Sequence, residues 1–291
     1  MQSAGRTGPG SANGSPASGH PSHGFSSGGP GSSSPGRLEA EQVRDMFDRI
    51  AGVYDVMNTA MTAGLHHRWR ERATDLARVG PGSRVLDVAT GTGDLAIELA
   101  RRVWPGGEVV GSDFSEGMLA RARSKAAVAD LKDVKPTFEW GDALELPYED
   151  DSFDAATAGF SARNFSDLSR GLAEMARVVR PGGRVVVLDF TTPTKPPLSI
   201  FFEVWFDRLV PVLGRLTGSI AAAVSRIRGS SSDATIAEAY AYLPNSVKRF
   251  ATPEELAAEM ERAGLREISY LLTAGGIVAI HAATVSGEAK R

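Results

Sequence analysis

Apolar positions along the chain follow two different spacings. Short runs such as Val85-Leu86-x-Val88 are nearly continuous and β-branched, as strands buried on both faces of a sheet require. Longer segments between these runs place apolar residues three and four positions apart, which is the spacing of an amphipathic helix. We predict strands at 85–88, 108–113, 137–142, 153–160 and 184–190, with helices at 94–101, 115–128 and 167–179. This alternation predicts an α/β fold around a mostly parallel sheet.

The last part of the chain has a different pattern. Its predicted elements are a helix at 253–263 and strands at 266–273 and 276–284. Thr252 is suited to be the N-cap of this helix and Pro253 its first residue. The two strands follow each other closely, so we expect an antiparallel hairpin over Ala274-Gly275. The turn at 181–183, Pro-Gly-Gly, is predicted to end the helix before it as a C-cap.

Composition divides the chain into a tail and one folded domain. Residues 1–37 are almost entirely Ser, Gly, Pro and Ala, cannot bury enough apolar surface to order, and are predicted to be disordered. We assign 38–284 to the domain and 285–291 to a C-terminal tail. Within the domain we expect an N-terminal helical cap at 38–78 and a lid or insertion at 196–250, flexible at 219–236.

Two helical segments of this domain allow more than one interpretation. Apolar residues between 39 and 58 predict one amphipathic helix, either packed in the core or covering a ligand, with Tyr54 and Asn58 on the same face. A second helix is expected at about 66–78, where His66-His67 are interpreted as solvated or capping. The segment 196–217, rich in Phe, Leu and Val, is an ordinary core helix, a cover for an apolar substrate, or a membrane-surface helix.

A glycine turn follows the first predicted strand and opens the next helix. Gly91-x-Gly93-x-x-Ala96 matches the dinucleotide fingerprint, but Asp87 ends the strand and Asp94 begins the helix. A pyrophosphate would be repelled by these carboxylates, whereas the sulfonium and ammonium of S-adenosylmethionine would be attracted. The turn with its two acids therefore favours S-adenosylmethionine, although the glycines alone also allow NAD(P).

Polar residues come where the other predicted strands end. Asp113 follows the second strand about 20 residues after the glycine turn, the position of a ribose-binding acid, although it could also cap the next helix with Ser115. Asp142 and Ala143 follow the third strand and are placed for the adenine amino group and for a backbone contact. Arg163 and Asn164 follow the fourth strand, so we expect them to face the reaction zone.

Composition excludes several classes of function. The 291 residues include no cysteine, so disulfides, thiolate metal sites and cysteine nucleophiles are absent. The five histidines show no zinc-site spacing, and a formal net charge of −3 does not favour nucleic acid as a partner. No apolar run reaches the ~18–20 residues of a membrane span. The expectation is a cytoplasmic protein, with contact at the inner face of the membrane left open.

Several stretches together resemble one family. They are the segment 47–58 (Phe-x-x-Ile-Ala-x-x-Tyr-Asp-x-Met-Asn), the turn at 87–94, the Gly-Phe-x-x-Arg-Asn of 159–164, the turn at 181–183, the Tyr-Leu-Pro-x-Ser of 242–246 and the stretch 272–281. In this order the chain resembles the menaquinone and ubiquinone biosynthesis C-methyltransferases over about 38–284. The glycine turn and Pro-Gly-Gly are common to most class I methyltransferases, and the other stretches are much more specific.

The resemblance implies a class I methyltransferase, a Rossmann-like three-layer sandwich with a seven-stranded sheet. It implies methylation of a ring carbon of a demethylated polyprenyl quinol by S-adenosylmethionine, with demethylmenaquinol preferred and a ubiquinone precursor as the alternative. By position, the donor-binding residues would be Thr92, Asp113, Asp142 and Ala143. Gly159 and Ser161 depart from the family pattern, in which a serine and a glycine are found. A homodimer is compatible with the sequence, which leaves the oligomeric state open.

The mechanism expected from this resemblance needs the reduced quinol, because a ring carbon is a poor nucleophile until a neighbouring hydroxyl loses its proton. The protein aligns the reactants and excludes water, and a base removes the proton. Arg163 and Asn164 are the predicted catalytic residues, with Arg163 stabilising the phenolate and Tyr54 or His281 as further candidates. Three alternatives remain: a class I methyltransferase for another small molecule, an NAD(P)-dependent reductase and a non-catalytic donor-binding partner.

Overall fold

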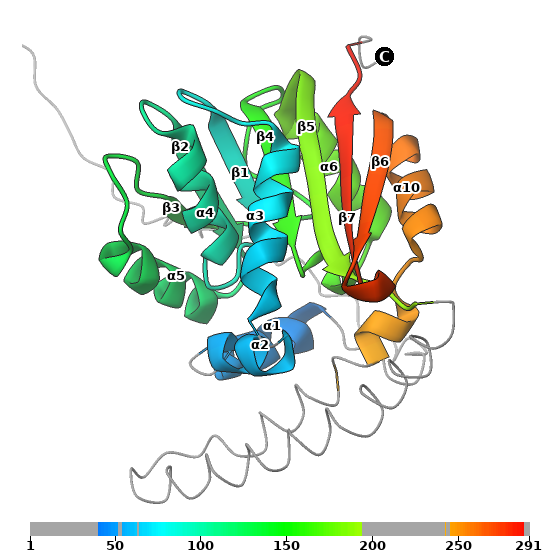
Figure 1. Cartoon of the computed structure of the whole chain (residues 1–291), viewed down its shortest axis with the longest axis horizontal. Helices are drawn as coiled ribbons and strands as arrows, with labels where there is room; N and C mark the ends of the chain where they lie inside the picture. Colours follow the sequence, from blue (N-terminus) through cyan, green and yellow to red (C-terminus); the bar gives the residue numbers. More distant parts are fainter. Residues whose placement is uncertain (1–39, 52–53, 63, 194–241, 243–244, 288–291) are drawn as a thin grey trace, which may run out of the picture. The chain divides into compact units, whose positions relative to one another are not determined.

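A seven-stranded sheet forms the centre of the domain, with the strand order β3-β2-β1-β4-β5-β7-β6 (Figure 1). The computed structural model describes residues 40–51, 54–62, 64–193, 242 and 245–287. The first five strands in sequence pair in parallel, and β7 is antiparallel to both of its neighbours. Successive strands lie on one side of β1 as far as β3 and on its other side from β4 onward. The carboxyl ends of β1 and β4 therefore flank a topological switch point, where ligands bind in open α/β sheets.

The elements follow the predicted alternation. The strands are β1 (Arg84–Val88), β2 (Glu108–Asp113), β3 (Thr137–Trp140), β4 (Phe153–Gly159), β5 (Val179–Phe190), β6 (Leu265–Thr273) and β7 (Val278–Val285). The α-helices are α1 (Ala40–Ile50), α2 (Tyr54–Thr62), α3 (Leu65–Ala77), α4 (Asp94–Val103), α5 (Glu116–Val128), α6 (Leu168–Val178) and α10 (Pro253–Arg262). Two short 3-10 helices are η1 (Ala162–Asn164) and η3 (Ala274–Gly276). The predicted α/β class and its seven-stranded, mostly parallel sheet are confirmed.

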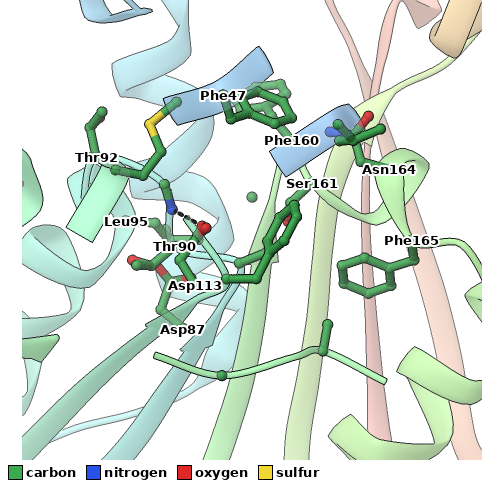
Figure 2. A pocket seen from close by; sticks show the side chains of 18 of the residues that line it. Phe47, Asp87, Thr90, Thr92, Leu95, Asp113, Phe160, Ser161, Asn164 and Phe165 are labelled. Carbon is green, nitrogen blue, oxygen red and sulfur yellow. Dashed lines mark hydrogen bonds between the residues drawn. The ribbon is translucent and has the colours of Figure 1, made fainter. Parts of the chain in front are cut away.

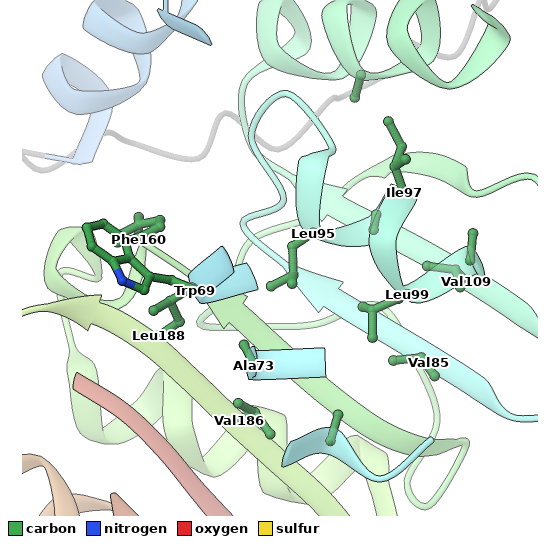
Figure 3. Close-up of a cluster of buried hydrophobic side chains, with 14 of the residues drawn as sticks. Trp69, Ala73, Val85, Leu95, Ile97, Leu99, Val109, Phe160, Val186 and Leu188 are labelled. Atoms are coloured by element: carbon green, nitrogen blue, oxygen red, sulfur yellow. The ribbon is translucent and has the colours of Figure 1, made fainter. Parts of the chain in front are cut away.

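Two apolar layers hold helices against the faces of the sheet. On one face α3, α4 and α5 bury a cluster that includes Trp69, Ala73 and Leu99 against strand residues such as Val186 (Figure 3). On the other face α6 and α10 cover a second cluster that includes Leu172. The central strands are therefore buried on both faces, which explains their continuous apolar runs.

The first part of the N-terminal cap is divided between two helices, so the prediction of one helix over 39–58 was wrong. Helix α1 ends at Ile50 and α2 begins at Tyr54. The sequence between them contains Gly52, and glycine disfavours a helix interior by about 1 kcal/mol relative to alanine. The apolar spacing continues across the interruption, so it identified the buried side of both helices and missed the break.

The Pro-Gly-Gly turn lies inside β5, so its prediction as a helix C-cap was wrong. Helix α6 ends at Val178, and Val179 already pairs with Phe153 of β4. The register between these strands then shifts before Ala155. At Gly183 a Cβ atom would lie 2.5 Å from the Asp154 carbonyl oxygen, so the backbones approach too closely there for any other residue. The glycines therefore allow the irregular start of β5 to approach β4 closely.

The C-terminal strands form the predicted antiparallel hairpin. Strand β7 inserts between β5 and β6, with Val187 opposite His281 and Tyr270 opposite the same histidine on the other side. The connection is the 3-10 turn η3, and Thr252 closes a capping box with Glu255 at the start of α10, as predicted for this N-cap.

Several predictions fall on residues outside the described part of the chain. They are the tail at 1–37, the segment 196–217, the flexible segment 219–236 and most of the C-terminal tail. Among the described residues, no helix is long and apolar enough to cross a membrane. Within the same residues, no group of three or more His, Cys, Asp and Glu side chains is arranged to hold a metal ion.

Candidate functional site

A cavity opens at the carboxyl ends of β1, β2, β3 and β4 (Figure 2). The glycine turn and the strand-end acids line one part of it, and aromatic side chains from the cap and from the loop after β4 line the rest. Seven of the nine residues in the predicted site line this cavity: Asp87, Gly91, Thr92, Asp113, Asp142, Ala143 and Asn164. Gly93 and Arg163 lie behind its lining. The structure therefore gathers residues from four strand ends around one space.

The glycine turn leaves room for a ligand at one of its two glycines. Gly91 has φ +57°, and a Cβ atom built there would meet no protein atom within 4 Å. Gly93 has φ +81°, and its Cβ would lie 2.9 Å from both Ala122 and Phe138. The backbone at Gly91 thus faces open space, whereas Gly93 is required for close packing of the turn against α5 and β3.

Asp87 is a buried carboxylate prepared for a cationic or hydrogen-bond-donating ligand. Its Oδ1 accepts a hydrogen bond from the Thr157 hydroxyl at 2.7 Å, and its Oδ2 accepts one from Thr90 at 2.6 Å. Burial raises the pKa of Asp87 to about 6, although both hydrogen bonds favour the ionised form. A bound ammonium group would compensate this loss of hydration, so the side chain fits the predicted role at the donor.

Asp113 is arranged in the same way at the end of β2. Its Oδ2 accepts from the Gly91 N–H at 2.8 Å and its Oδ1 from the Ser115 N–H at 2.9 Å. Burial raises the pKa of Asp113 to about 6, against these two backbone hydrogen bonds. The cap of α5 is Ser115, whose hydroxyl accepts from the Met118 N–H. The Asp113 oxygens keep lone pairs toward the cavity, which fits a pair of ribose hydroxyls.

Asp94 does not have the role expected from its position. It pairs with Arg70 at 3.2 Å and with Lys125, and although burial opposes it, these cations hold the pKa of Asp94 below its ordinary value. Its charge is thus already balanced inside the protein, so the expectation that it attracts a cationic donor is corrected. Sequence spacing could not reveal this, because Arg70 and Lys125 come from distant helices.

The Thr92 hydroxyl is engaged away from the cavity centre. It donates to the Asp55 Oδ1 of α2 at 2.6 Å and accepts from the Lys125 ammonium at 3.1 Å. Thr92 lines the cavity, but its side chain joins the cap to the glycine turn. The Thr92 hydroxyl thus has two protein partners already, and its contact with the donor stays a prediction.

Asp142 and Ala143 lie at the rim, beyond the end of β3. The Asp142 Oδ1 accepts from the Leu144 N–H at 2.9 Å, which shapes a tight turn and leaves the other oxygen toward the cavity. Ala143 follows in the same turn and lines the cavity. This placement suits an adenine amino group and a backbone contact, as predicted for the two residues.

The opposite wall is aromatic and carries one amide. Phe160 and Phe165 lie there with Ser161 and Asn164 between them in the chain (Figure 2). The Asn164 Oδ1 accepts from the Tyr242 hydroxyl at 3.1 Å, which fixes the amide and leaves its NH2 group as a donor. Phe160 has φ +60°, an uncommon conformation for a bulky residue that marks this loop as strained.

Arg163 lies behind this wall in a buried ion pair. Its Nη1 is 2.6 Å from the Asp189 Oδ1 and also donates to the Phe160 carbonyl, and its backbone N–H donates to the Asp189 Oδ2 at 3.1 Å. Burial alone would lower the pKa of Arg163, but the Asp189 carboxylate raises it above its ordinary value. The guanidinium thus binds the protein itself, while Tyr54 and Tyr242 lie near enough to feel its charge.

Of the histidines in the described part of the chain, His66 and His281 are buried, and neither lines the cavity. His66, interpreted from the sequence as solvated or capping, is buried against Thr62 at 2.7 Å, and burial together with Arg70 lowers its pKa to about 4. The interpretation was wrong for His66 and holds for the exposed His67. His281 is fully buried beside Pro253, whose carbonyl oxygen lies 2.9 Å from its Nε2. That position makes His281 structural and removes it as a candidate base.

Some residues of the site were not identified from the sequence. Asp189 is the second-last residue of β5, and the sequence pattern includes it in an apolar run, although an acid there is a strand-end signal like Asp113. Asp48 and Asp55 each follow an aromatic residue that lines the cavity, a repeated pair seven residues apart. Lys125 of α5 contacts Asp55, Thr92 and Asp94, and nothing in the sequence distinguishes it from other helix lysines.

Solved structures resemble this chain in fold at low sequence identity. A methyltransferase from Aquifex aeolicus described as SAM-dependent has 17% identity and a TM-score of 0.52, and covers 86% of this chain and all of its own. The [4+2]-cyclase SpnF has 18% identity and a TM-score of 0.58, over 87% of this chain and 98% of its own. At such identities the similarity establishes the fold alone.

Curated relatives are far more similar in sequence. Demethylmenaquinone methyltransferases of Thermus thermophilus and Desulfitobacterium hafniense are 44% and 40% identical, over 81% and 87% of this chain and 98% and 92% of their own lengths. A ubiquinone/menaquinone biosynthesis C-methyltransferase of Geobacter sulfurreducens is 40% identical, over 84% of this chain and 88% of its own. The model of one family matches residues 36–285. The chain therefore belongs to the ubiE/COQ5 methyltransferase family.

Proposed function

We propose that this protein transfers a methyl group from S-adenosylmethionine to a ring carbon of demethylmenaquinol, which gives menaquinol. The observation that carries this proposal is the division of the cavity. One part carries the buried acids Asp87 and Asp113 beside the open backbone of Gly91, and the other is aromatic around Asn164. The names of the 44% and 40% identical relatives support the same acceptor.

The donor half fits the polar groups of S-adenosylmethionine. Asp87 accepts from the ammonium group, Asp113 accepts from the ribose hydroxyls, and the turn at Asp142 receives the adenine edge. Both acids are buried, and their protein hydrogen bonds use only part of their accepting capacity, so a ligand with donors at these points is favoured. The donor supplies a methyl group on a sulfonium, which is already activated for transfer.

The acceptor half fits a flat apolar ring with hydroxyl groups. Phe47, Phe160 and Phe165 offer aromatic surface, and the Asn164 NH2 group and the Tyr54 hydroxyl offer polar contacts to a ring oxygen. The ring must be reduced, because only a deprotonated hydroxyl gives its neighbouring carbon enough electron density to form the new carbon–carbon bond. The ring carbon then loses its proton, so one proton is released for each methyl group transferred.

The role of Arg163 changes in this proposal from direct contact to positioning. Its ion pair with Asp189 fixes the η1 turn, and that turn presents Asn164 to the cavity. Its charge still lies near Tyr54 and Tyr242, so it favours negative charge on oxygen atoms at this wall. Asn164 and Tyr54 are the groups that we assign to contact with the quinol oxygen, and a water molecule that they hold would accept its proton.

Contact with a membrane surface forms part of the proposal, because a polyprenyl quinol resides in a bilayer. The acceptor has to enter the aromatic half from the lipid, so binding to vesicles should increase when the vesicles contain demethylmenaquinol. Vesicles without the quinol provide the comparison. Equal binding to both would contradict recruitment by the substrate.

The direct test uses purified protein with methyl-labelled S-adenosylmethionine and two acceptors in separate reactions. Reduced demethylmenaquinol is expected to take up label in the lipid phase, and the oxidised quinone should take up none. A demethylated ubiquinone precursor in its reduced form tests the alternative acceptor, which the name of the Geobacter relative includes. Label only in that benzoquinol would overturn the menaquinone assignment, and label in neither, with donor binding measured, would overturn the quinol assignment.

A further inference from the structure

The two cap helices repeat one arrangement. In α1 Phe47 lines the cavity and is followed by Asp48, and in α2 Tyr54 lines the cavity and is followed by Asp55. The two aromatic rings meet edge to face, with centroids 6.0 Å apart. Because each acid directly follows a cavity-lining aromatic residue, any contact that fixes the acid also fixes the direction of the aromatic ring.

Asp48 binds the N-terminus of α5. Its Oδ1 accepts from the Ser115 hydroxyl at 2.5 Å and from the Gly117 N–H at 3.0 Å. A carboxylate at this end of a helix is favoured by the unpaired N–H groups and by the helix dipole. A Cβ atom at Gly117 would lie only 3.0–3.1 Å from Asp48 atoms, so the helices are closely apposed. Ser115 also donates its backbone N–H to Asp113, which places this contact directly beside the donor half.

Asp55 binds the glycine turn and α5. Its Oδ1 accepts from the Thr92 hydroxyl at 2.6 Å and from the Lys125 ammonium at 3.0 Å, and Arg121 lies 3.7 Å from its other oxygen. Lys125 pairs at the same time with Asp94 at the start of α4. The side chains of Asp55 and Lys125 are about one-quarter exposed, so this is a partly buried pair, less screened than a surface one.

We infer that Asp48 and Asp55 are positioning residues that hold the cap over the donor and set Phe47 and Tyr54 against the reactants. This inference rests on the proposed function for the identity of the reactants. Its first test, the affinity for S-adenosylhomocysteine, depends only on the donor site. Both acids bind residues adjacent to donor-site residues, Ser115 beside Asp113 and Thr92 beside Gly91. A donor that orders the glycine turn and the start of α5 therefore also favours the closed cap, and a closed cap strengthens donor binding in return.

The test measures donor-site affinity by calorimetry with S-adenosylhomocysteine, together with the kinetics of methyl transfer. Asp55→Ala and the double variant Asp48→Ala/Asp55→Ala are expected to raise Kd at least tenfold, since the bound conformation is then only a fraction of the population. Asp55→Asn keeps an acceptor for Thr92 and loses the charge facing Lys125, so it should fall between the wild type and Asp55→Ala. Asp75→Ala removes an acid that is also ion-paired, with Arg102, and is the matched control, expected to stay within twofold.

Hydrogen exchange separates positioning from general destabilisation. In the wild type, S-adenosylhomocysteine should slow amide exchange across α1 and α2, and in the Asp55 variants this protection should be lost while β1 and β4 exchange as before. At saturating donor the variants should also show a reduced kcat, because Tyr54 is no longer held. A Kd within twofold of wild type in Asp55→Ala, or unchanged cap protection, would overturn the inference. A wild-type protein that binds donor with cap protection but methylates no quinol would refute only the proposed function.

Discussion

The donor site should lose affinity in acid because two of its acids titrate together. Asp87 and Asp113 must be ionised to accept hydrogen bonds from an ammonium group and from ribose hydroxyls, and burial raises the pKa of each to about 6. At pH 8 both are ionised, and at pH 5 each is about 90% protonated, so each costs about tenfold in affinity. The two together predict a Kd for S-adenosylhomocysteine about 100-fold higher at pH 5 than at pH 8.

The fold should survive this range, because the buried groups offset each other. The pKa of both carboxyl groups is raised in the folded state, so their stabilising contribution is present at low pH and lost as the pH rises through 6. Lowering the pH from 8 to 5 thus adds about 1.4 kcal/mol for each. The pKa of His66 is lowered to about 4, so folding loses about 2 kcal/mol as the unfolded chain takes up that proton. These three groups together change the free energy of unfolding by about 1 kcal/mol.

Calorimetric titration with S-adenosylhomocysteine at half-unit steps from pH 8 to pH 5 measures the effect, with circular dichroism as the check on folding. This ligand keeps the ammonium group and the ribose hydroxyls and lacks the sulfonium. Asp87→Asn should bind more weakly at pH 8 and lose only about tenfold more by pH 5, since one titrating acid remains. The exposed acid variant Asp75→Asn should keep the full wild-type profile. A wild-type Kd that changes less than threefold, or an undiminished slope in Asp87→Asn, would refute the reasoning.

Four further substitutions test the site and the core separately. Gly91→Ala and Gly82→Ala both place alanine at positive φ with no neighbour within 4 Å, so each should lower the free energy of unfolding by about 1–2 kcal/mol. Only Gly91→Ala should weaken donor binding, by tenfold or more. Equal donor affinities of the two variants would contradict binding of the donor in the open space at Gly91. Asp189→Asn leaves the buried Arg163 charge without its partner, so the free energy of unfolding measured with urea should fall by about 3–5 kcal/mol. The kcat toward quinol should fall as well. An unchanged kcat would contradict the positioning role of this ion pair. Phe153→Ala should lower the free energy of unfolding by about 3–5 kcal/mol, because the ring is fully buried. Donor affinity should stay unchanged, since Phe153 begins β4 at the end remote from the cavity. Weakened donor binding would show that the two ends of the sheet are coupled.

Local patterns were sufficient wherever neighbouring residues decide the structure. The apolar runs identified every strand of the sheet, and the Thr252-Pro253 start of α10 was readable because N-capping depends on residues within one turn. The acids at the ends of β1 and β2 were also found, because parallel strands bring their carboxyl ends to the same edge. Local patterns failed where a backbone contact from elsewhere decides, as at the Pro-Gly-Gly segment, which pairs with β4 and does not end a helix.

Pairing between distant charges was decided only by the tertiary structure. From the sequence, Asp94 was expected to attract the cationic donor, and Arg163 was expected to stabilise the phenolate. The fold brings Arg70 and Lys125 to the first and Asp189 to the second, so both charges are balanced within the protein. A charge that a counter-ion holds acts more weakly on a ligand, and a counter-ion can come from any part of the chain. The sequence by itself therefore determined the sheet, the ligand edge and the chemistry available there, and the tertiary structure decided which of those groups remain for the ligand.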